Sequence, residues 1–110
     1  MVTPLEDKIE LQKYLYILFL YVEGKLNAIE FEKIFLKYRR QDDYWLSGKF
    51  RRDIGDSLDR FFLDLDEFTP DDLYDPNDAF SINEVVLKQR AKELLNELSA
   101  FSGVKILIHN

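Results

Sequence analysis

The sequence contains no cysteine and a single histidine, His109, close to the C-terminal end. Without cysteine there is no disulfide, thiolate nucleophile or zinc–thiolate site, and the composition fits a reducing cytoplasm. One histidine in this position gives no support to Ser-His-Asp or Cys-His catalysis. The phosphate-binding patterns G-x-x-x-x-G-K-[ST] and G-x-G-x-x-G do not occur either. We therefore expect no catalytic residue, no bound cofactor and no metal site.

Long hydrophobic runs are also missing. The longest uncharged stretch, residues 14–22, has nine residues and cannot cross a bilayer. It does not resemble a signal peptide, because acidic residues offset the lysines before it and no A-x-A-like cleavage site follows. A pI near 4.7 argues against direct binding to nucleic acid or to anionic membranes. The sequence therefore predicts a cytoplasmic protein that binds neither.

The acidic residues that are present are distributed unevenly. Residues 1–60 hold 11 basic and 11 acidic groups, whereas residues 61–110 hold 4 basic and 10 acidic ones, so the net charge of −6 arises in the second half. Residues 61–87 contain no Lys or Arg and eight acidic side chains: Asp64, Asp66, Glu67, Asp71, Asp72, Asp75, Asp78 and Glu84. Such a concentration serves solubility or attracts a cationic partner. A partner with a basic, nucleic-acid-binding face is the specific interpretation, and a solvated loop without a partner is the alternative.

The acidic segment does not fit a calcium loop. In the pattern D-x-[DN]-x-[DN]-G, a start at Asp64 puts Phe68 and Thr69 at the fifth and sixth positions. A start at Asp75 puts Ala79 and Phe80 there, so neither frame has the glycine that the sharp turn requires. Acid–base catalysis needs a pocket that shifts a pKa, and a loop of ionised neighbours with two prolines is expected to be hydrated. We expect a protein that is not an enzyme.

Helix start and stop signals divide the chain into four helical segments. The first is expected from Thr3, as N-cap, to Glu23, with Gly24 as the left-handed stop, and to be the central helix. Asn27 and Glu30 form a capping box for a second helix ending near Tyr38. These two helices should be antiparallel neighbours, because the connection is short.

Apolar residues resume helical spacing from Phe50 to Leu65, after a polar break at residues 39–48. Ser81 is expected to cap the last helix, which Gly103 ends. The core face of that helix is expected to hold Val85, Leu87, Ala91, Leu94, Leu95 and Leu98. The fold class predicted is all-α: one domain over residues 1–110, an antiparallel four-helix bundle with an acidic, proline-containing linker before the last helix. The tail 104–110 is peripheral, with a strand-like composition that suits lying across the bundle or pairing with another chain.

Large side chains lie among the carboxylates of the linker. Phe68, Leu73 and Tyr74 have the composition of a binding hot spot, in which apolar anchors are surrounded by charge. The alternative for Phe68 and Tyr74 is that they hold the linker against the core. Trp45, the only tryptophan, is expected to be mainly part of the core.

One long run of residues has a familiar pattern. It reads Leu20-x-x-x-Gly24-Lys25-Leu26-x-Ala28-x-Glu30-Phe31-Glu32-x-x-Phe35-x-x-Tyr38-Arg39, and similarity continues through Leu58-Asp59-x-Phe61-Phe62-x-x-x-Asp66-x-Phe68 to Ile82-x-Glu84-x-x-Leu87 and Leu94-Leu95. The pattern resembles small colicin D-type immunity proteins and related immunity proteins of contact-dependent growth inhibition systems. The resemblance covers roughly residues 15–99. The linker and the tail after Gly103 depart from the pattern.

The resemblance implies a four-helix bundle that binds and neutralises a cognate toxin, typically a tRNA-cleaving nuclease. Such a toxin presents cations to RNA phosphates. Carboxylates of the immunity protein would occupy the phosphate positions and cover the basic active-site cleft. The toxin-binding residues expected from this are Asp64, Asp66, Glu67, Phe68, Asp71, Asp72, Tyr74, Asp75 and Asp78.

Two alternatives remain open at this point. The chain also carries a basic cluster, here Lys37, Arg39, Arg40, Lys49, Arg51 and Arg52. This cluster is either a solvated face partly paired with nearby aspartates or a second contact with an acidic part of the toxin. The second functional class is a non-enzymatic helical scaffold or regulator that self-associates, with the tail as a weak homo-oligomer contact.

Overall fold

The computed structural model describes residues 3–78 and 81–103. These residues form the helices α1 (Leu5–Val22), α2 (Ala28–Arg40), α3 (Asp43–Leu46), α4 (Arg52–Asp66) and α5 (Glu84–Ser102). The described residues contain no strand, and a single isolated parallel bridge joins Phe68 to Ile82. The predicted all-α class is confirmed. The tail 104–110, including His109, lies outside the described residues.

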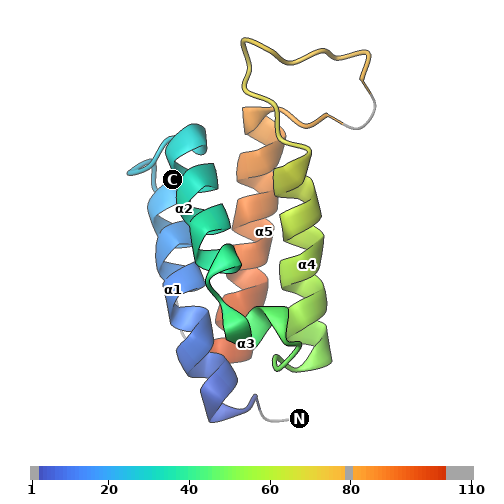
Figure 1. Cartoon of the computed structure of the whole chain (residues 1–110). Coiled ribbons are helices and arrows are strands. Elements are labelled where there is room, and N and C mark those ends of the chain that lie inside the picture. The colour runs from blue at the N-terminus through green and yellow to red at the C-terminus, as the bar shows by residue number, and fades with distance from the viewer. Residues whose placement is uncertain (1–2, 79–80, 104–110) are drawn as a thin grey trace.

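The long helices lie side by side and alternate in direction along the chain (Figure 1). The short α3 crosses the end at which the N-terminus lies, and the segment between α4 and α5 projects beyond the opposite end. Helix α5 packs against α1, α4 and α2, so it occupies the central position that the sequence had suggested for α1. The molecule measures 42 × 32 × 22 Å.

Several helix ends follow directly from local sequence. The Asn27 side chain accepts a hydrogen bond from the Glu30 amide at 2.8 Å, and the Glu30 carboxylate accepts one from the Asn27 amide at 3.0 Å, which confirms the capping box. Gly24 and Gly103 have φ values of +79° and +74°, in the left-handed region that glycine tolerates best. Both therefore end their helices as predicted.

Two predicted caps were wrong. Pro4, with an extended ψ of 145°, is the N-cap of α1, so the helix starts one residue later than expected and Thr3 makes no cap. The cap of α5 is Asn83, whose side chain accepts a hydrogen bond from the Val86 amide at 3.0 Å. Ser81 lies before the helix because the bridge between Phe68 and Ile82 keeps this part of the chain extended.

The predicted break at residues 39–48 contains one turn of helix that the sequence pattern did not reveal. Helix α2 runs on to Arg40, and Asp42 then caps α3 by accepting a hydrogen bond from the Trp45 amide at 3.1 Å. This turn delivers Trp45 into the core, where 5% of it is exposed. The indole N–H donates to Asp59 at 2.8 Å, so the polar atom of the ring is satisfied.

Aromatic side chains form the centre of the core. Phe35 is fully buried, and its ring centroid lies 5.4 Å from Tyr14, 5.2 Å from Phe61 and 6.0 Å from Trp45. These tilted and edge-on pairs join α1, α2, α4 and the α3 turn. On α5 the predicted core face is buried except for Val85, which is 76% exposed and was wrongly assigned to the core.

Two aspartates are buried at the end of the molecule that carries α3. Asp42 accepts hydrogen bonds from the Tyr14 hydroxyl and the Trp45 amide and forms an ion pair with Lys13 at 3.1 Å. Asp7 accepts hydrogen bonds from the Tyr44 hydroxyl and, at 2.9 Å, from the Arg51 amide. Buried carboxylates are tolerated only with such partners, so both act as structural ties between distant segments.

Candidate functional site: an acidic surface and an adjoining groove

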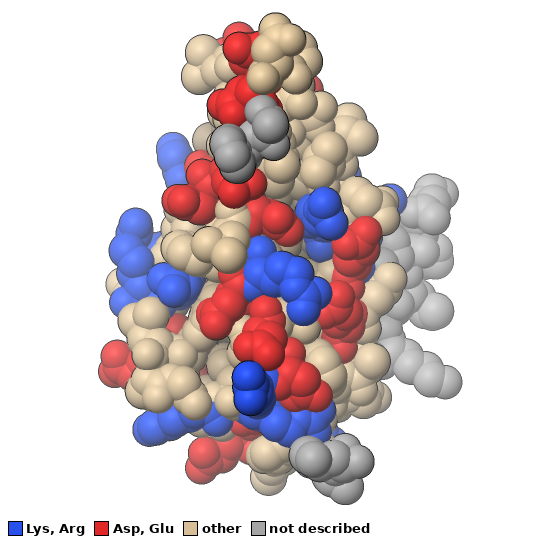
Figure 2. All heavy atoms as spheres, turned by 90° about the vertical axis from the view of Figure 1, so that its right-hand side faces the viewer, with Lys and Arg blue, Asp and Glu red and all other residues tan. Residues whose placement is uncertain are grey.

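Six of the predicted toxin-binding carboxylates are exposed at one end of the molecule. We call them the acidic surface: Asp66, Glu67, Asp71, Asp72, Asp75 and Asp78. They start at the last residue of α4 and continue into the projecting segment. Figure 2 shows acidic side chains on this projection, whereas acidic and basic side chains alternate over the helices below it. The negative potential is therefore concentrated beyond the helix ends, where a partner can reach it.

The base of the projection is held by hydrogen bonds. The Thr69 amide donates to the Ile82 carbonyl at 2.9 Å, and the Ile82 amide donates to the Glu67 carbonyl at 3.1 Å. The hydroxyls of Thr69 and Ser81 lie 2.6 Å apart. Phe68 is only 8% exposed, so its ring anchors the start of the projection in the core. This placement fits the anchoring interpretation of Phe68 better than a direct contact with a partner.

Two carboxylates of the acidic surface also order the backbone around them. Asp71 accepts a hydrogen bond from the Glu84 amide at 3.2 Å, which ties the projection to the first turn of α5. Asp75 accepts one from the Asn77 amide at 2.9 Å, which stabilises the turn at Pro76. Tyr74 is half-buried, whereas Leu73 beside it is 72% exposed.

Asp64 lies apart from the acidic surface. It faces α5 from the last turn of α4, and its carboxylate is 3.9 Å from the Arg90 guanidinium. Burial raises the pKa of Asp64, and the charge of Arg90 only partly opposes this effect. Asp64 is thus engaged within the molecule, and helical spacing alone did not reveal this.

The structure adds an acidic residue that the sequence reasoning did not select. Burial, followed by the charge of Asp66, raises the pKa of Glu32 on α2. The effect of Asp66 shows that the negative potential at the end of α4 extends across to α2. The signal in the sequence was weak, because Glu32 and Asp66 are 34 positions apart in the chain.

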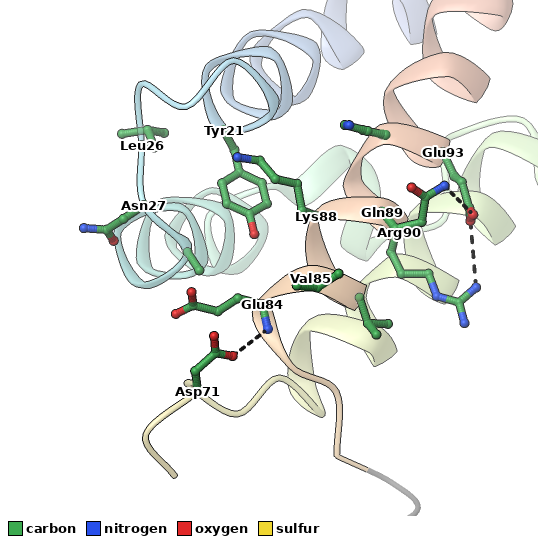
Figure 3. A pocket seen from close by; sticks show the side chains of 13 residues that line it. Tyr21, Leu26, Asn27, Asp71, Glu84, Val85, Lys88, Gln89, Arg90 and Glu93 are labelled. Carbon is green, nitrogen blue, oxygen red and sulfur yellow. Dashed lines mark hydrogen bonds and ion pairs between the residues drawn. The ribbon is translucent and has the colours of Figure 1, made fainter. Parts of the chain in front are cut away.

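A groove of about 840 Å³ adjoins the acidic surface. Its walls come from the α1–α2 turn, the first turns of α5 and Asp71 (Figure 3). In this view the carboxylates of Asp71 and Glu84 lie close to each other and below the Tyr21 hydroxyl. Burial, and then the charges of Glu84 and Asp71, raise the pKa of Tyr21 to about 12. Sequence reasoning missed this groove because its walls come from three separated segments.

Two residues of the basic cluster, Arg39 and Arg51, make contacts within the chain. The Arg39 guanidinium lies 3.7 Å from the centre of the Phe62 ring and 5.0 Å from that of Trp45. Arg51 forms an ion pair with Asp53 at 2.6 Å, and this hydrogen bond is the main reason why the pKa of Asp53 is lowered. The pairing of Arg51 with Asp53 agrees with the partly paired interpretation, whereas Arg39 packs on aromatic rings, which neither interpretation of the cluster predicted.

Neither a metal centre nor a membrane span is found in the described part of the chain. Across residues 3–78 and 81–103, no group of three His, Cys, Asp or Glu side chains is arranged to hold a metal ion. Over the same residues, no helix has both the length and the hydropathy needed to cross a bilayer.

Comparison with known families matches residues 9–98 to the family described as bacterial self-protective colicin-like immunity. Searches of curated proteins and of solved structures found no match. The family match includes all of α2, α3 and α4, most of α1 and α5, and the whole acidic surface. The chain therefore belongs to the family of bacterial colicin-like immunity proteins.

Proposed function

We propose that this protein binds and neutralises a cognate bacterial toxin, and that the toxin is a tRNA-cleaving nuclease. Membership of the immunity family suggests toxin neutralisation at the general level. The observation that carries the specific proposal is the acidic surface, which presents six exposed carboxylates at the end of α4 and on the projection, whose base is fixed by hydrogen bonds to Ile82, just before α5. A nuclease that cleaves RNA needs a cationic cleft to hold phosphates, and a fixed array of carboxylates complements such a cleft.

In this proposal the acidic surface occupies the phosphate positions of the toxin and blocks access to its active site. Long-range attraction accelerates association, and close pairs within the interface slow dissociation. Leu73 and Tyr74 supply apolar contact area between the charges. Phe68 anchors the start of the projection in the core, and Asp64 pairs with Arg90 of α5, so both contribute to binding indirectly.

The proposal also covers the subfamily of the protein, its location in the cell and its architecture. We place it with colicin D-type immunity proteins or with those of contact-dependent growth inhibition systems, acting in the cytoplasm without catalysis and without binding nucleic acid itself. Its architecture is then an antiparallel four-helix bundle in which an acidic, proline-containing linker carries the binding residues. An inhibitor of this kind needs only a rigid complementary surface, in agreement with the family's generally non-catalytic role.

Co-expression tests the function directly. The chain is produced together with the C-terminal domain of a candidate cognate toxin, sought first in the gene upstream of its own, and growth and tRNA integrity are measured. Rescue of growth with intact tRNA supports the proposal. Continued tRNA cleavage, or a toxin that damages another target, contradicts the nuclease assignment.

Charge reversal tests the surface. Glu67→Lys combined with Asp72→Lys places two cations on the acidic surface, and neither side chain makes a structural hydrogen bond in the described structure. We expect protection to be lost while the free energy of unfolding changes by less than about 1 kcal/mol, because exposed charges are weak stabilisers. The matched control is Asp43→Lys with Asp56→Lys, the same charge change on exposed residues of α3 and α4. Equal protection by both double variants would contradict the mimicry mechanism.

One observation favours the self-associating scaffold as a second candidate. Leu5, Ile9 and Tyr16 on α1 are 71%, 53% and 64% exposed, and their spacing places them on one side of the helix. Exposed apolar side chains on one side of a helix suit contact with a second copy, although the exposed Gln12 separates Ile9 from Tyr16. Sedimentation velocity at increasing protein concentration tests it, since a scaffold self-associates whereas an inhibitor remains a monomer that forms a 1:1 complex with toxin.

A further inference from the structure

We propose that the groove beside the acidic surface receives a lysine or arginine side chain carried on a protruding loop of the toxin. This inference rests on the proposed function and specifies where the complex is anchored. The acidic surface attracts the toxin over a distance, whereas the groove holds one cationic side chain in a defined position. The two roles predict different kinetic effects and can be separated.

The shape and lining of the groove suit such a side chain. Its volume of about 840 Å³ is within the range that holds a ligand or a short peptide segment. Leu26, Val85 and the edge of Tyr21 supply apolar walls for the aliphatic stem of lysine or arginine. Val85 is 76% exposed, although the hydrophobic pattern of α5 had predicted it to be buried. An apolar side chain exposed beside a carboxylate pair is what a cation with an aliphatic stem contacts best.

The carboxylates at one end of the groove provide the charge complement. One carboxylate oxygen of Asp71 accepts a hydrogen bond from the Glu84 amide at 3.2 Å. This bond fixes the direction of the carboxylate and leaves its other oxygen available. The carboxylates of Asp71 and Glu84 converge in Figure 3. A cation placed between them would relieve their mutual repulsion, and arginine could engage both.

The lysine nearest to this pair does not neutralise it. Lys88 lies one helical turn after Glu84, a spacing that often forms an ion pair on a helix. Its ammonium instead lies 5.2 Å from the centre of the Tyr21 ring, and no ion pair joins it to Glu84. Arg90, on the other side of Val85, is directed to Asp64 and Glu93 at 3.9 and 3.8 Å. Within the described residues, neither Lys88 nor Arg90 forms an ion pair with Asp71 or Glu84, which leaves this end of the groove open to an incoming positive charge.

Paired variants separate the groove from the general field. Asp71→Asn with Glu84→Gln removes the charge of both side chains and retains their size. The asparagine can still accept a hydrogen bond from the backbone amide of residue 84. The matched control, Glu67→Gln with Asp72→Asn, removes the same charge from the acidic surface outside the groove. Each variant is titrated against the purified, catalytically inactivated toxin domain used in the co-expression test, and association and dissociation rates are measured by surface plasmon resonance.

We expect the groove pair to raise the dissociation rate at least about 30-fold, because truncating a desolvated charge contact acts mainly on dissociation. The control pair should lower the association rate by less than about tenfold and raise the dissociation rate much less than the groove pair does, because Glu67 and Asp72 are exposed and their charge contacts stay better hydrated. Val85→Trp, which fills the groove from an exposed position, should weaken binding about as much as the groove pair. Leu46→Trp, at an exposed position of α3 at the opposite end of the molecule, does not line the groove and should not weaken binding.

The possible failures are distinct. If the wild-type protein does not bind the toxin domain, the proposed function fails, and this inference fails with it. If the wild-type protein binds tightly but the groove pair and the control pair have the same effect on dissociation, the proposed function stands and the groove inference is overturned. If the groove pair alone raises the dissociation rate, single Lys→Ala and Arg→Ala variants of the toxin domain locate the partner residue. In double-mutant cycles this residue should be coupled energetically to Glu84 and Asp71 and not to Glu67.

Discussion

The buried carboxylate of Asp42 offers a stringent test of how this fold is held together. Only 2% of the residue is exposed, and its side chain accepts hydrogen bonds from Tyr14 and the Trp45 amide and pairs with Lys13 at 3.1 Å. Asp42→Ala removes the cap of α3 and leaves the Tyr14 hydroxyl without its partner. Breaking a buried charged network of this kind costs about 3–5 kcal/mol. This is a large part of the roughly 5–15 kcal/mol that stabilises a typical domain.

The control is the neighbouring residue. Asp43 is exposed, and its side chain makes no hydrogen bond in the described structure, so Asp43→Ala should change the free energy of unfolding by about 0.5 kcal/mol or less. Asp42→Asn retains an oxygen for the Trp45 amide while removing the charge, and its effect should lie between those of the two alanine variants.

The effect of Asp42 should also depend on pH. Burial by itself would raise the pKa of Asp42, but the hydrogen bonds from Tyr14, the Trp45 amide and Lys13, with the Lys13 charge, together hold it below the usual 3.8. A carboxyl whose pKa is lower in the folded state stabilises the protein above its unfolded-state pKa. That contribution is lost as the pH falls through the folded-state value. The difference between wild type and Asp42→Asn should therefore be full at pH 7 and shrink below about pH 4.

Urea denaturation followed by tryptophan fluorescence measures these differences. Trp45 is the only tryptophan and lies three residues from Asp42, so its emission reports on the affected region. Far-UV circular dichroism in parallel shows whether the whole domain unfolds in the same transition. A cost below about 1 kcal/mol for Asp42→Ala, or one equal to that of Asp43→Ala, would refute the role assigned to the buried network.

Three further predictions concern other parts of the molecule. Phe35→Ala should lower the free energy of unfolding by about 3–5 kcal/mol, because it leaves a cavity between four aromatic neighbours. Leu63→Ala, at a position that is 60% exposed, should lower it by less than about 1 kcal/mol in the same urea titration. Asn83→Ala should lower the free energy of unfolding by about 1 kcal/mol and accelerate hydrogen exchange at the Val86 amide. Ser81→Ala should produce neither effect if Asn83 is the cap of α5. Tyr21 should ionise near pH 12 when followed by NMR of ring-labelled tyrosine, and Asp71→Asn should lower this pKa. Because the folded state favours the neutral phenol, the stabilisation from Tyr21 should be complete below pH 10 and decline between about pH 10 and 12; an unchanged pKa in Asp71→Asn would contradict the groove geometry.

Much of the helical framework could be predicted because its signals are local. The capping box of Asn27 and Glu30 lies within four consecutive residues, and the left-handed stops at Gly24 and Gly103 require only a residue without a Cβ. Phe31 and Phe35 are spaced one helical turn apart, and both are buried on the same side of α2, as hydrophobic periodicity requires. Where a prediction failed, as at Ser81, a tertiary bridge had overridden an equally plausible local signal.

The acidic surface could be anticipated in composition but not in shape. Clustering of the carboxylates is visible in the sequence, since residues 61–87 lack any basic side chain. Which carboxylates face solvent depends on contacts with α5: Asp64 is drawn to Arg90, whereas Asp72 is exposed. The anchoring of Phe68 has the same origin, because its partner segment begins more than ten residues later.

The sequence by itself determined the helical class, the principal helix ends, most of the core face of α5 and the concentration of negative charge in one segment. Each depends on neighbours within a few positions, where hydrogen bonding and hydrophobic periodicity act directly. Only the tertiary structure decided the α3 turn, the burial of Asp7 and Asp42, the pairing of Asp64 and the groove between Tyr21 and Glu84. These features join residues that are distant in the chain, such as Asp42 and Tyr14, and their geometry arises from the packing of whole helices against one another.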